Sequence, residues 1–89
     1  MKYYARLTNP NNGMPIDKKN IKLLDDKVYY MVEELEIGYY ISHCKLKSAI
    51  GRYGSQWFNI SQFSFYDNEL RQVDILRTEL NKKGYELYD

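Results

Sequence analysis

The side chains that could perform covalent or acid–base chemistry are few, and the two most reactive ones are neighbours. The chain has one histidine, His43, and one cysteine, Cys44. A thiol needs an adjacent base to become a good nucleophile, but successive residues of a strand point to opposite faces of the sheet. We therefore predict that Cys44 is a small core residue, that His43 lies at the surface, and that the protein is not an enzyme.

The same scarcity argues against a metal or cofactor site. A zinc site takes about four ligands, and this chain offers a single imidazole and a single thiol. No carboxylate–histidine spacing repeats along the sequence. We expect neither a metal ion nor a cofactor.

A different pattern lies in residues 37–66, which contain no acidic side chain. Basic and aromatic side chains are interleaved there. Tyrosine, tryptophan and arginine dominate protein-binding hot spots, and aromatic rings beside cations also bind single-stranded nucleic acid. The candidate partner-binding residues in this stretch are Tyr39, Tyr40, Lys45, Lys47, Arg52, Tyr53 and Trp57.

Of these two binding functions we favour a small non-enzymatic module that binds a protein partner, with single-stranded nucleic-acid binding as the alternative. The net charge of +1 gives no global field that would draw the chain to nucleic acid or to an anionic membrane. Three basic residues also make a small footprint for nucleic acid. We expect no membrane partner, and self-association stays open.

The composition fits one globular domain over residues 1–89, because 44% of the side chains are hydrophobic and 28% are charged. The sequence has no long apolar run and does not open with a charged leader followed by an apolar segment. These features are typical of a cytoplasmic protein.

Alternation of apolar and polar residues predicts most of the secondary structure. A strand is expected over residues 2–8, with Tyr3, Ala5 and Leu7 on its buried side. A long connection over residues 9–24 has no readable conformation. Further strands are expected at 27–37, 39–46, 57–60 and 63–66, with a hairpin joining the first two, a bulge at Glu33-Glu34 and a loop at 48–56.

The C-terminal part has the spacing of an amphipathic helix over residues 68–83. Leu70, Val73, Leu76 and Leu80 fall on one stripe, whereas Ile75 falls off it. Asp67 or Asn68 would cap its start, and residues 85–87 could form a short strand after it. The predicted fold is therefore α+β, a curved antiparallel sheet with one C-terminal helix.

Tyrosines are unusually frequent, and several come in adjacent pairs. Ten occur in the chain, including Tyr3-Tyr4, Tyr29-Tyr30 and Tyr39-Tyr40. On strands, each pair would place one ring in the core and the other outside. Tyrosine suits both positions, because its ring packs while its hydroxyl group stays hydrated.

Two segments and the glycine between them carry a recognisable pattern: LDDKVYYMVEEL at residues 24–35, Gly51, and WFNISQFSF at residues 57–65. They resemble the small SH3-like barrel proteins common in phages and prophages of Gram-positive bacteria, although Asp26 stands where those proteins usually have glycine. The resemblance implies an SH3-like barrel and a phage origin. It constrains function little, since one fold serves many unrelated roles. By analogy with other phage proteins, we expect a protein that binds and inhibits a host protein, such as a defence or nucleic-acid enzyme, in the host cytoplasm.

Overall fold

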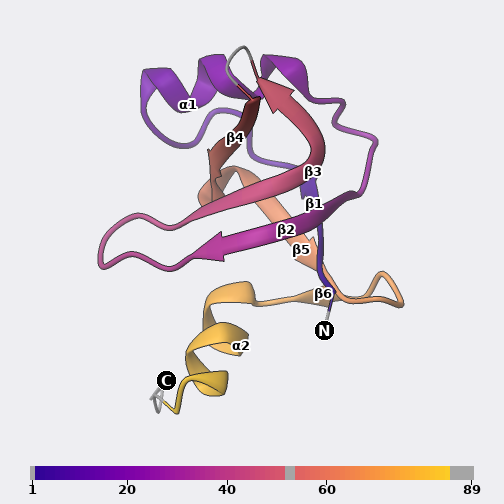
Figure 1. Ribbon diagram of the computed structural model, residues 1–89, viewed down its shortest axis with the longest axis vertical. Helices are drawn as coiled ribbons and strands as arrows, with labels where there is room; N and C mark the ends of the chain where they lie inside the picture. Colours follow the sequence, from indigo (N-terminus) through magenta and orange to yellow (C-terminus); the bar gives the residue numbers. More distant parts are fainter. Residues whose placement is uncertain (1, 52–53, 85–89) are drawn as a thin grey trace.

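The strands form one curved antiparallel sheet. The computed structural model describes residues 2–51 and 54–84, and in these ranges six strands pair in the order β4-β3-β2-β1-β5-β6. Their bounds are β1 (Tyr4–Leu7), β2 (Tyr30–Glu36), β3 (His43–Gly51), β4 (Gly54–Asn59), β5 (Phe63–Tyr66) and β6 (Gln72–Val73). The predicted α+β class, with a curved antiparallel sheet and a C-terminal helix, is confirmed (Figure 1).

The helical segments lie at the two ends of the sheet. Helix α1 (Pro15–Asn20) continues into the 3-10 turn η1 (Ile21–Leu23) beside the β3–β4 hairpin, whereas α2 (Ile75–Lys82) lies at the opposite end (Figure 1). A second 3-10 turn, η2 (Ile60–Gln62), separates β4 from β5 at the predicted break. Each of these connections changes the direction of the chain, so that strands distant in sequence become neighbours.

Strand β1 lies at the centre of the fold and follows the predicted alternation. It pairs with β2 on one side and β5 on the other, with Ala5 opposite Tyr30 and Phe65. The predicted inward residues Tyr3, Ala5 and Leu7 are all buried. Two-sided pairing leaves β1 no free edge, which is why even a small residue such as Ala5 is fully removed from solvent.

The β2–β3 hairpin contains the predicted bulge. Val32 pairs with Leu46 but Glu34 pairs with Lys45, so two residues of β2 oppose one residue of β3. The extra residue reverses the alternation and brings Leu35 opposite the buried Cys44. Without the bulge, Leu35 would face solvent and a glutamate would face the core.

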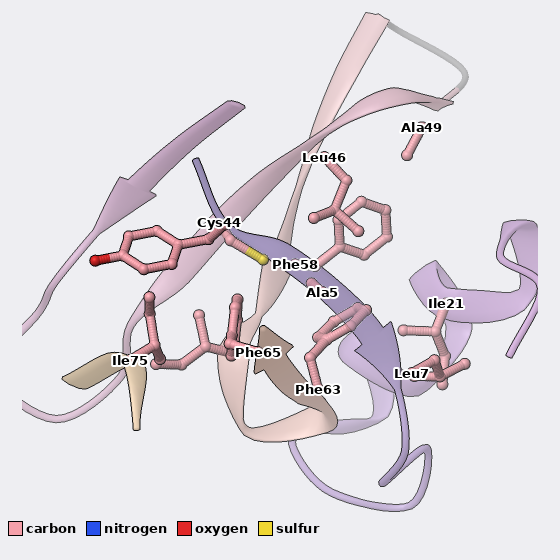
Figure 2. Close-up of a cluster of buried hydrophobic side chains, with 12 residues drawn as sticks. Ala5, Leu7, Ile21, Cys44, Leu46, Ala49, Phe58, Phe63, Phe65 and Ile75 are labelled. Atoms are coloured by element: carbon pink, nitrogen blue, oxygen red, sulfur yellow. The ribbon is translucent and has the colours of Figure 1, made fainter. Parts of the chain in front are cut away.

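The core is a single cluster enclosed by the curved sheet. Phe58 and Phe63 meet edge to face with their ring centres 6.0 Å apart, and Cys44 and Leu46 pack from β3 (Figure 2). The buried members are Tyr3, Ala5, Leu7, Ile21, Cys44, Leu46, Ala49, Phe58, Ile60, Phe63, Phe65 and Ile75. They come from β1, η1, β3, β4, η2, β5 and α2, so the cluster joins nearly every element.

The predicted helix at residues 68–83 is wrong in its first half. Residues 67–71 form a tight turn instead, because the Asp67 carboxylate accepts hydrogen bonds from the backbone N–H groups of Glu69 and Arg71 at 2.9 and 3.0 Å. Leu70 adopts a positive φ of 59° in this turn. An aspartate that can cap a helix can also close a turn, and here β6 follows the turn and pairs with β5.

The late start of α2 changes which residues are buried. Asp74 caps the helix by accepting a hydrogen bond from the Arg77 N–H at 3.2 Å. Ile75, predicted to lie off the apolar stripe, is buried with 6% exposure, whereas the predicted stripe residue Leu76 is 40% exposed. Lys82 donates a 2.6 Å hydrogen bond from its ammonium group to the Tyr3 hydroxyl oxygen, and this contact ties the helix end to the start of the sheet.

The remaining differences concern loops. The connection at residues 9–24 contains α1 and η1, and the predicted loop at 48–56 is largely strand, since β3 reaches Gly51 and β4 begins at Gly54. Residues 39–42, predicted as strand, are a loop in which both Tyr39 and Tyr40 are exposed, contrary to the predicted one-in, one-out arrangement. The predicted strand at 85–87 lies outside the described residues.

Candidate binding cleft

A cleft of about 640 Å³ opens where three parts of the chain meet. These are the β2–β3 loop, the segment from the end of β4 through β5, and the start of α2. The loop before α1 closes one side. The lining residues are Asn9, Gly13, Met14, Tyr40, Ile41, Ser42, Asn59, Ile60, Ser61, Phe63, Ser64, Phe65, Gln72, Val73, Asp74, Ile75 and Leu76.

The cleft has an apolar floor and an exposed apolar rim. Buried core residues form the floor, among them Phe63, Phe65 and Ile75. The rim consists of large side chains that the core leaves exposed, namely Met14, Tyr40, Ile41 and Leu76. Apolar side chains gathered around a concavity are typical of a surface that binds another molecule.

Hydrogen bonds fix the β2–β3 loop at the rim. The Ser42 hydroxyl oxygen accepts a hydrogen bond from the Gly38 N–H at 3.1 Å, and the Ser42 carbonyl accepts one from the Ile60 N–H at 3.1 Å. Gly38 is required for this closure, since a Cβ there would lie 2.1 Å from the Ile41 carbonyl oxygen. The loop is therefore held against η2, and Tyr40 and Ile41 project from a fixed base.

Asp17 holds the opposite side. Its carboxylate accepts hydrogen bonds from the Met14 N–H at 2.8 Å and from the Asn59 side-chain amide at 3.2 Å. Asn59 is itself buried, and its amide oxygen accepts the Ser61 N–H at 3.0 Å. One aspartate thus joins the start of α1 to the end of β4, and it places Met14 beside the cleft.

The charge of the cleft is low. Among the lining residues none is lysine or arginine, and Asp74 is the one carboxylate. Asp74 already accepts the helix-capping hydrogen bond from Arg77 N–H. The polar groups of the lining are chiefly hydroxyl and amide groups, from Ser61, Ser64 and Gln72 among others. The cleft is therefore suited to a neutral or apolar segment.

The structure brings some of the seven predicted partner-binding residues together and separates others. Tyr39 and Tyr40 form an edge-to-face pair with ring centres 4.8 Å apart, and Tyr40 lines the cleft. Lys45 lies over the Trp57 ring, with its ammonium nitrogen 4.8 Å from the ring centre, on the outer face of the sheet. Lys47 is exposed on the same strand as Lys45, and Arg52 and Tyr53 lie outside the described residues.

The outer face is less basic than the sequence suggests. The Lys45 ammonium nitrogen lies 3.1 Å from a carboxylate oxygen of Glu34, which the hairpin pairs directly opposite it. Residues 37–66 contain no acidic side chain, but Glu34 of the adjacent strand adds a carboxylate to the surface that they form. The β2–β3 pairing, which places Glu34 of one strand directly opposite Lys45 of the other, is the physical reason.

Three rim residues were missed by sequence reasoning: Met14, Ile41 and Leu76. Leu76 was assigned to the core, and Met14 lies in a connection whose conformation was not readable. Ile41 was placed in the expected strand 39–46, although Gly38, three residues earlier, marks the turn from which the observed loop continues. No local pattern shows that these three positions meet, since 61 residues lie between Met14 and Leu76.

The reactive side chains lie apart from the cleft. Cys44 is fully buried, as predicted, and its burial raises the pKa of the thiol to about 12. His43 is half-buried on the other face of β3, opposite Asn59. Within residues 2–51 and 54–84, no group of three or more His, Cys, Asp or Glu side chains is placed to hold a metal ion.

Among the described residues, no helix has the length and apolar character needed to cross a membrane. The longest described helix, α2, has eight residues and carries charged side chains at several of them.

Comparison with models of protein families gives a match over nearly the whole chain. The family model described as bacteriophage T4 protein Y07B matches residues 2–87. No curated protein and no solved structure matches the chain. The family match includes all of β1 to α2, and thus every residue of the cleft. Since it spans nearly the whole sequence, the chain belongs to the bacteriophage T4 protein Y07B family.

Proposed function

We propose that this phage protein is a non-enzymatic binding module that takes an apolar segment of a protein partner into the cleft. The observation that carries the proposal is the exposed rim of Met14, Tyr40, Ile41 and Leu76 around an apolar floor. Burying such side chains against a partner is favourable by about 25 cal/mol per Å² of apolar surface. The hydrogen bonds accepted by the Ser42 hydroxyl and carbonyl oxygens and by the Asp17 carboxylate hold the β2–β3 loop and the start of α1 in place before binding, so little ordering is needed.

The lining favours a protein over a nucleic acid. A nucleic-acid site needs cations that follow the phosphate backbone, and the cleft contains no lysine or arginine among its lining residues. Its hydroxyl and amide groups are suited to the peptide groups of an extended chain. Tyr40 at the rim supplies a large ring with few rotatable bonds, which is the usual character of a hot-spot residue.

We further propose that the curved sheet is an SH3-like barrel. The support is the order of pairing, in which β1 lies between β2 and β5 while β2, β3 and β4 form a meander. The 3-10 turn η2 before the last long strand, β5, also fits this arrangement. Barrels of this type bind extended peptides in aromatic grooves, so the proposed fold and the proposed activity agree.

The partner we propose is a protein of the bacterial host, bound in the host cytoplasm. A phage protein without catalytic groups can change its host by occupying the surface of a host protein, for example a defence or nucleic-acid enzyme. Inhibition would then result from steric blocking by the bound module. Self-association through the same apolar rim is the competing use of this surface, and it is separated by measuring mass in solution.

The test is an affinity capture from lysate of a host bacterium, treated with nuclease, using the wild type and two matched leucine variants. Leu76→Ser removes an apolar rim residue, whereas Leu23→Ser changes an exposed leucine in η1 that does not line the cleft. We expect one stoichiometric protein to be retained by the wild type and by Leu23→Ser, and to be lost or at least tenfold depleted with Leu76→Ser, since about 1.4 kcal/mol is a tenfold change in affinity.

A partner retained equally by both variants would exclude the cleft. Sedimentation of the purified wild type as a dimer that Leu76→Ser converts to a monomer would assign the rim to self-association instead. The free energy of unfolding of both variants should be within about 1 kcal/mol of the wild-type value, because both substitutions are at exposed positions.

Single-stranded nucleic-acid binding remains the second candidate, on the outer face of the sheet. The supporting observation is that Lys45, Lys47 and the half-exposed Trp57 lie together on β3 and β4. Titration with a fluorescent oligodeoxythymidine should then quench Trp57 emission and weaken steeply with added salt. Lys47→Ala should reduce this affinity, and an unchanged Trp57 signal throughout the titration would rule the candidate out.

A further inference from the structure

A second surface feature, separate from the cleft, is the half-buried cation Arg6 on β1. Arg6 points away from the core, since its neighbours Ala5 and Leu7 are the buried residues, and it pairs across the sheet with Ser64. Its Nε atom is completely covered and has no hydrogen-bond partner. The terminal guanidinium nitrogens are not among the buried unpaired atoms of the described residues, so they retain access to solvent.

Two tyrosine rings cover the guanidinium group. Its central carbon lies 5.4 Å from the centre of the Tyr29 ring and 5.9 Å from that of Tyr66. The two rings are themselves in edge-to-face contact, with centres 4.9 Å apart, and Tyr66 is buried. The rings fix the orientation of the guanidinium group and attract its charge, while they reduce its hydration.

Arg6 has no carboxylate partner in the described part of the chain. No ion pair within 4 Å involves it, whereas the exposed Arg71 has two carboxylates nearby, those of Asp67 and Glu69. A partly dehydrated cation without a counter-charge is unfavourable, and an anion supplied from outside would relieve this. Its fixed planar fork is the geometry that recognises carboxylates in a bidentate manner.

We propose that Arg6 is a binding site for a carboxylate of the protein partner. The terminal guanidinium nitrogens, beside the Tyr29 ring, would bind an Asp or Glu side chain. A phosphate of a nucleic acid is the less suitable ligand, because phosphate chains are bound by several cations in a row and no second cation contacts the two rings among the described residues. Arg6, Tyr29 and Tyr66 are not among the residues that line the cleft, so the carboxylate site and the cleft can be tested independently.

The test uses the free protein with a defined probe, N-acetyl-glutamate amide, and follows the arginine Nε–H signals by NMR. Arg71 is the internal control, since its Nε already donates to Asp67 Oδ2 at 3.0 Å. We expect a saturable shift of the Arg6 signal with millimolar probe and a much smaller shift of the Arg71 signal. N-acetyl-glutamine amide, which has the same shape without the charge, should produce no saturable shift.

One variant and two control titrations, with sodium chloride and with inorganic phosphate, make the result decisive. Arg6→Lys keeps the charge but removes the fork, and backbone signals around residue 64 that the probe shifts in the wild type should respond at least tenfold more weakly in this variant. Equal shifts at Arg6 and Arg71, or the same response to sodium chloride, would overturn the proposal. Inorganic phosphate that saturates the site at lower concentration than the glutamate probe would reassign it to phosphate. Loss of the cleft interaction in Leu76→Ser would leave this result unaffected.

Discussion

At the scale of single residues, the fold places its one thiol where it cannot react. Cys44 lies in the middle of β3, opposite Phe58 on β4 and Leu35 on β2, and its side chain has no exposed surface. Burial disfavours the thiolate and raises the pKa of Cys44 from 9.0 to about 12. Cys44 therefore acts as a small apolar residue of the core.

The first prediction concerns this thiol. Native protein at pH 8 should react with Ellman's reagent at least roughly a hundredfold more slowly than protein in urea, because reaction requires an opening that costs several kcal/mol. Since the folded-state pKa is raised, the stabilisation from the protonated thiol is present below pH 9 and is lost as the pH rises towards about 12. Labelling at the same rate in the native and unfolded states would contradict the buried position.

At the scale of elements, the start of α2 decides which apolar residues enter the core. The helix begins at Ile75, and its first residue packs into the cluster with Phe65 and Cys44 (Figure 2). The next residue, Leu76, is directed to the cleft rim. Two adjacent aliphatic residues thus have different positions, one in the core and the other at the rim of the proposed binding cleft.

The second prediction follows from this division. Ile75→Ala should lower the free energy of unfolding by about 2–4 kcal/mol, because it removes a buried side chain and leaves a cavity. Leu76→Ala should lower it by less than about 1 kcal/mol, since the side chain is 40% exposed. Urea denaturation of both variants gives the comparison, and equal losses would show that Leu76 belongs to the core after all.

The third prediction concerns the turn between β5 and β6. The N–H of Arg71, followed by that of Glu69 and by the Arg71 side chain, lowers the pKa of Asp67 below 3.8. The stabilisation that Asp67 provides is therefore present above pH 3.8 and is lost as the pH falls below it. Asp67→Asn should unfold at lower urea than the wild type at pH 6, and the two should converge in acid. A difference that does not depend on pH would mean that the charge of Asp67 is unimportant.

Local sequence patterns predicted the strands better than the C-terminal helix. The alternation in β1 and the reversal at the bulge near Glu34 depend on neighbouring residues, so both could be read correctly. In contrast, Leu70 satisfies the helical spacing but lies in the Asp67 turn with a positive φ. The choice between a helix cap and a turn at Asp67 is made by pairing of Val73 with Phe65, a contact that the spacing of apolar residues does not encode.

The candidate site was harder to predict for a related reason. Tyr40 was identified from composition, but most other residues of the cleft come from the loop before α1, η2, β5, β6 and the start of α2. The acid-free stretch at residues 37–66 pointed to a basic face, yet the carboxylate of Glu34 from the adjacent strand pairs with Lys45. In both cases the surface is made by the pairing of distant segments, so it is visible only once the sheet order is known.

At the scale of the whole molecule, one core joins nearly all the elements, and this leads to the fourth prediction. The single tryptophan, Trp57, reports on β4 at one end of the sheet, whereas far-ultraviolet circular dichroism reports on the whole backbone, including α1 and α2. We expect the two signals to give the same urea midpoint, as in two-state unfolding of small domains. Separate midpoints would show that the helices unfold independently of the sheet.

In the proposed function, the loop that carries Tyr39 and Tyr40 can change its contact surface without changing the fold. Each ring is 92% exposed, and their ring contact is with each other rather than with the core. A single codon change at either position would alter the surface offered to a partner without creating a cavity, whereas Gly38 and Ser42 on each side are constrained by the loop closure. A phage whose target changes could therefore adjust its contact surface one residue at a time while keeping the same scaffold.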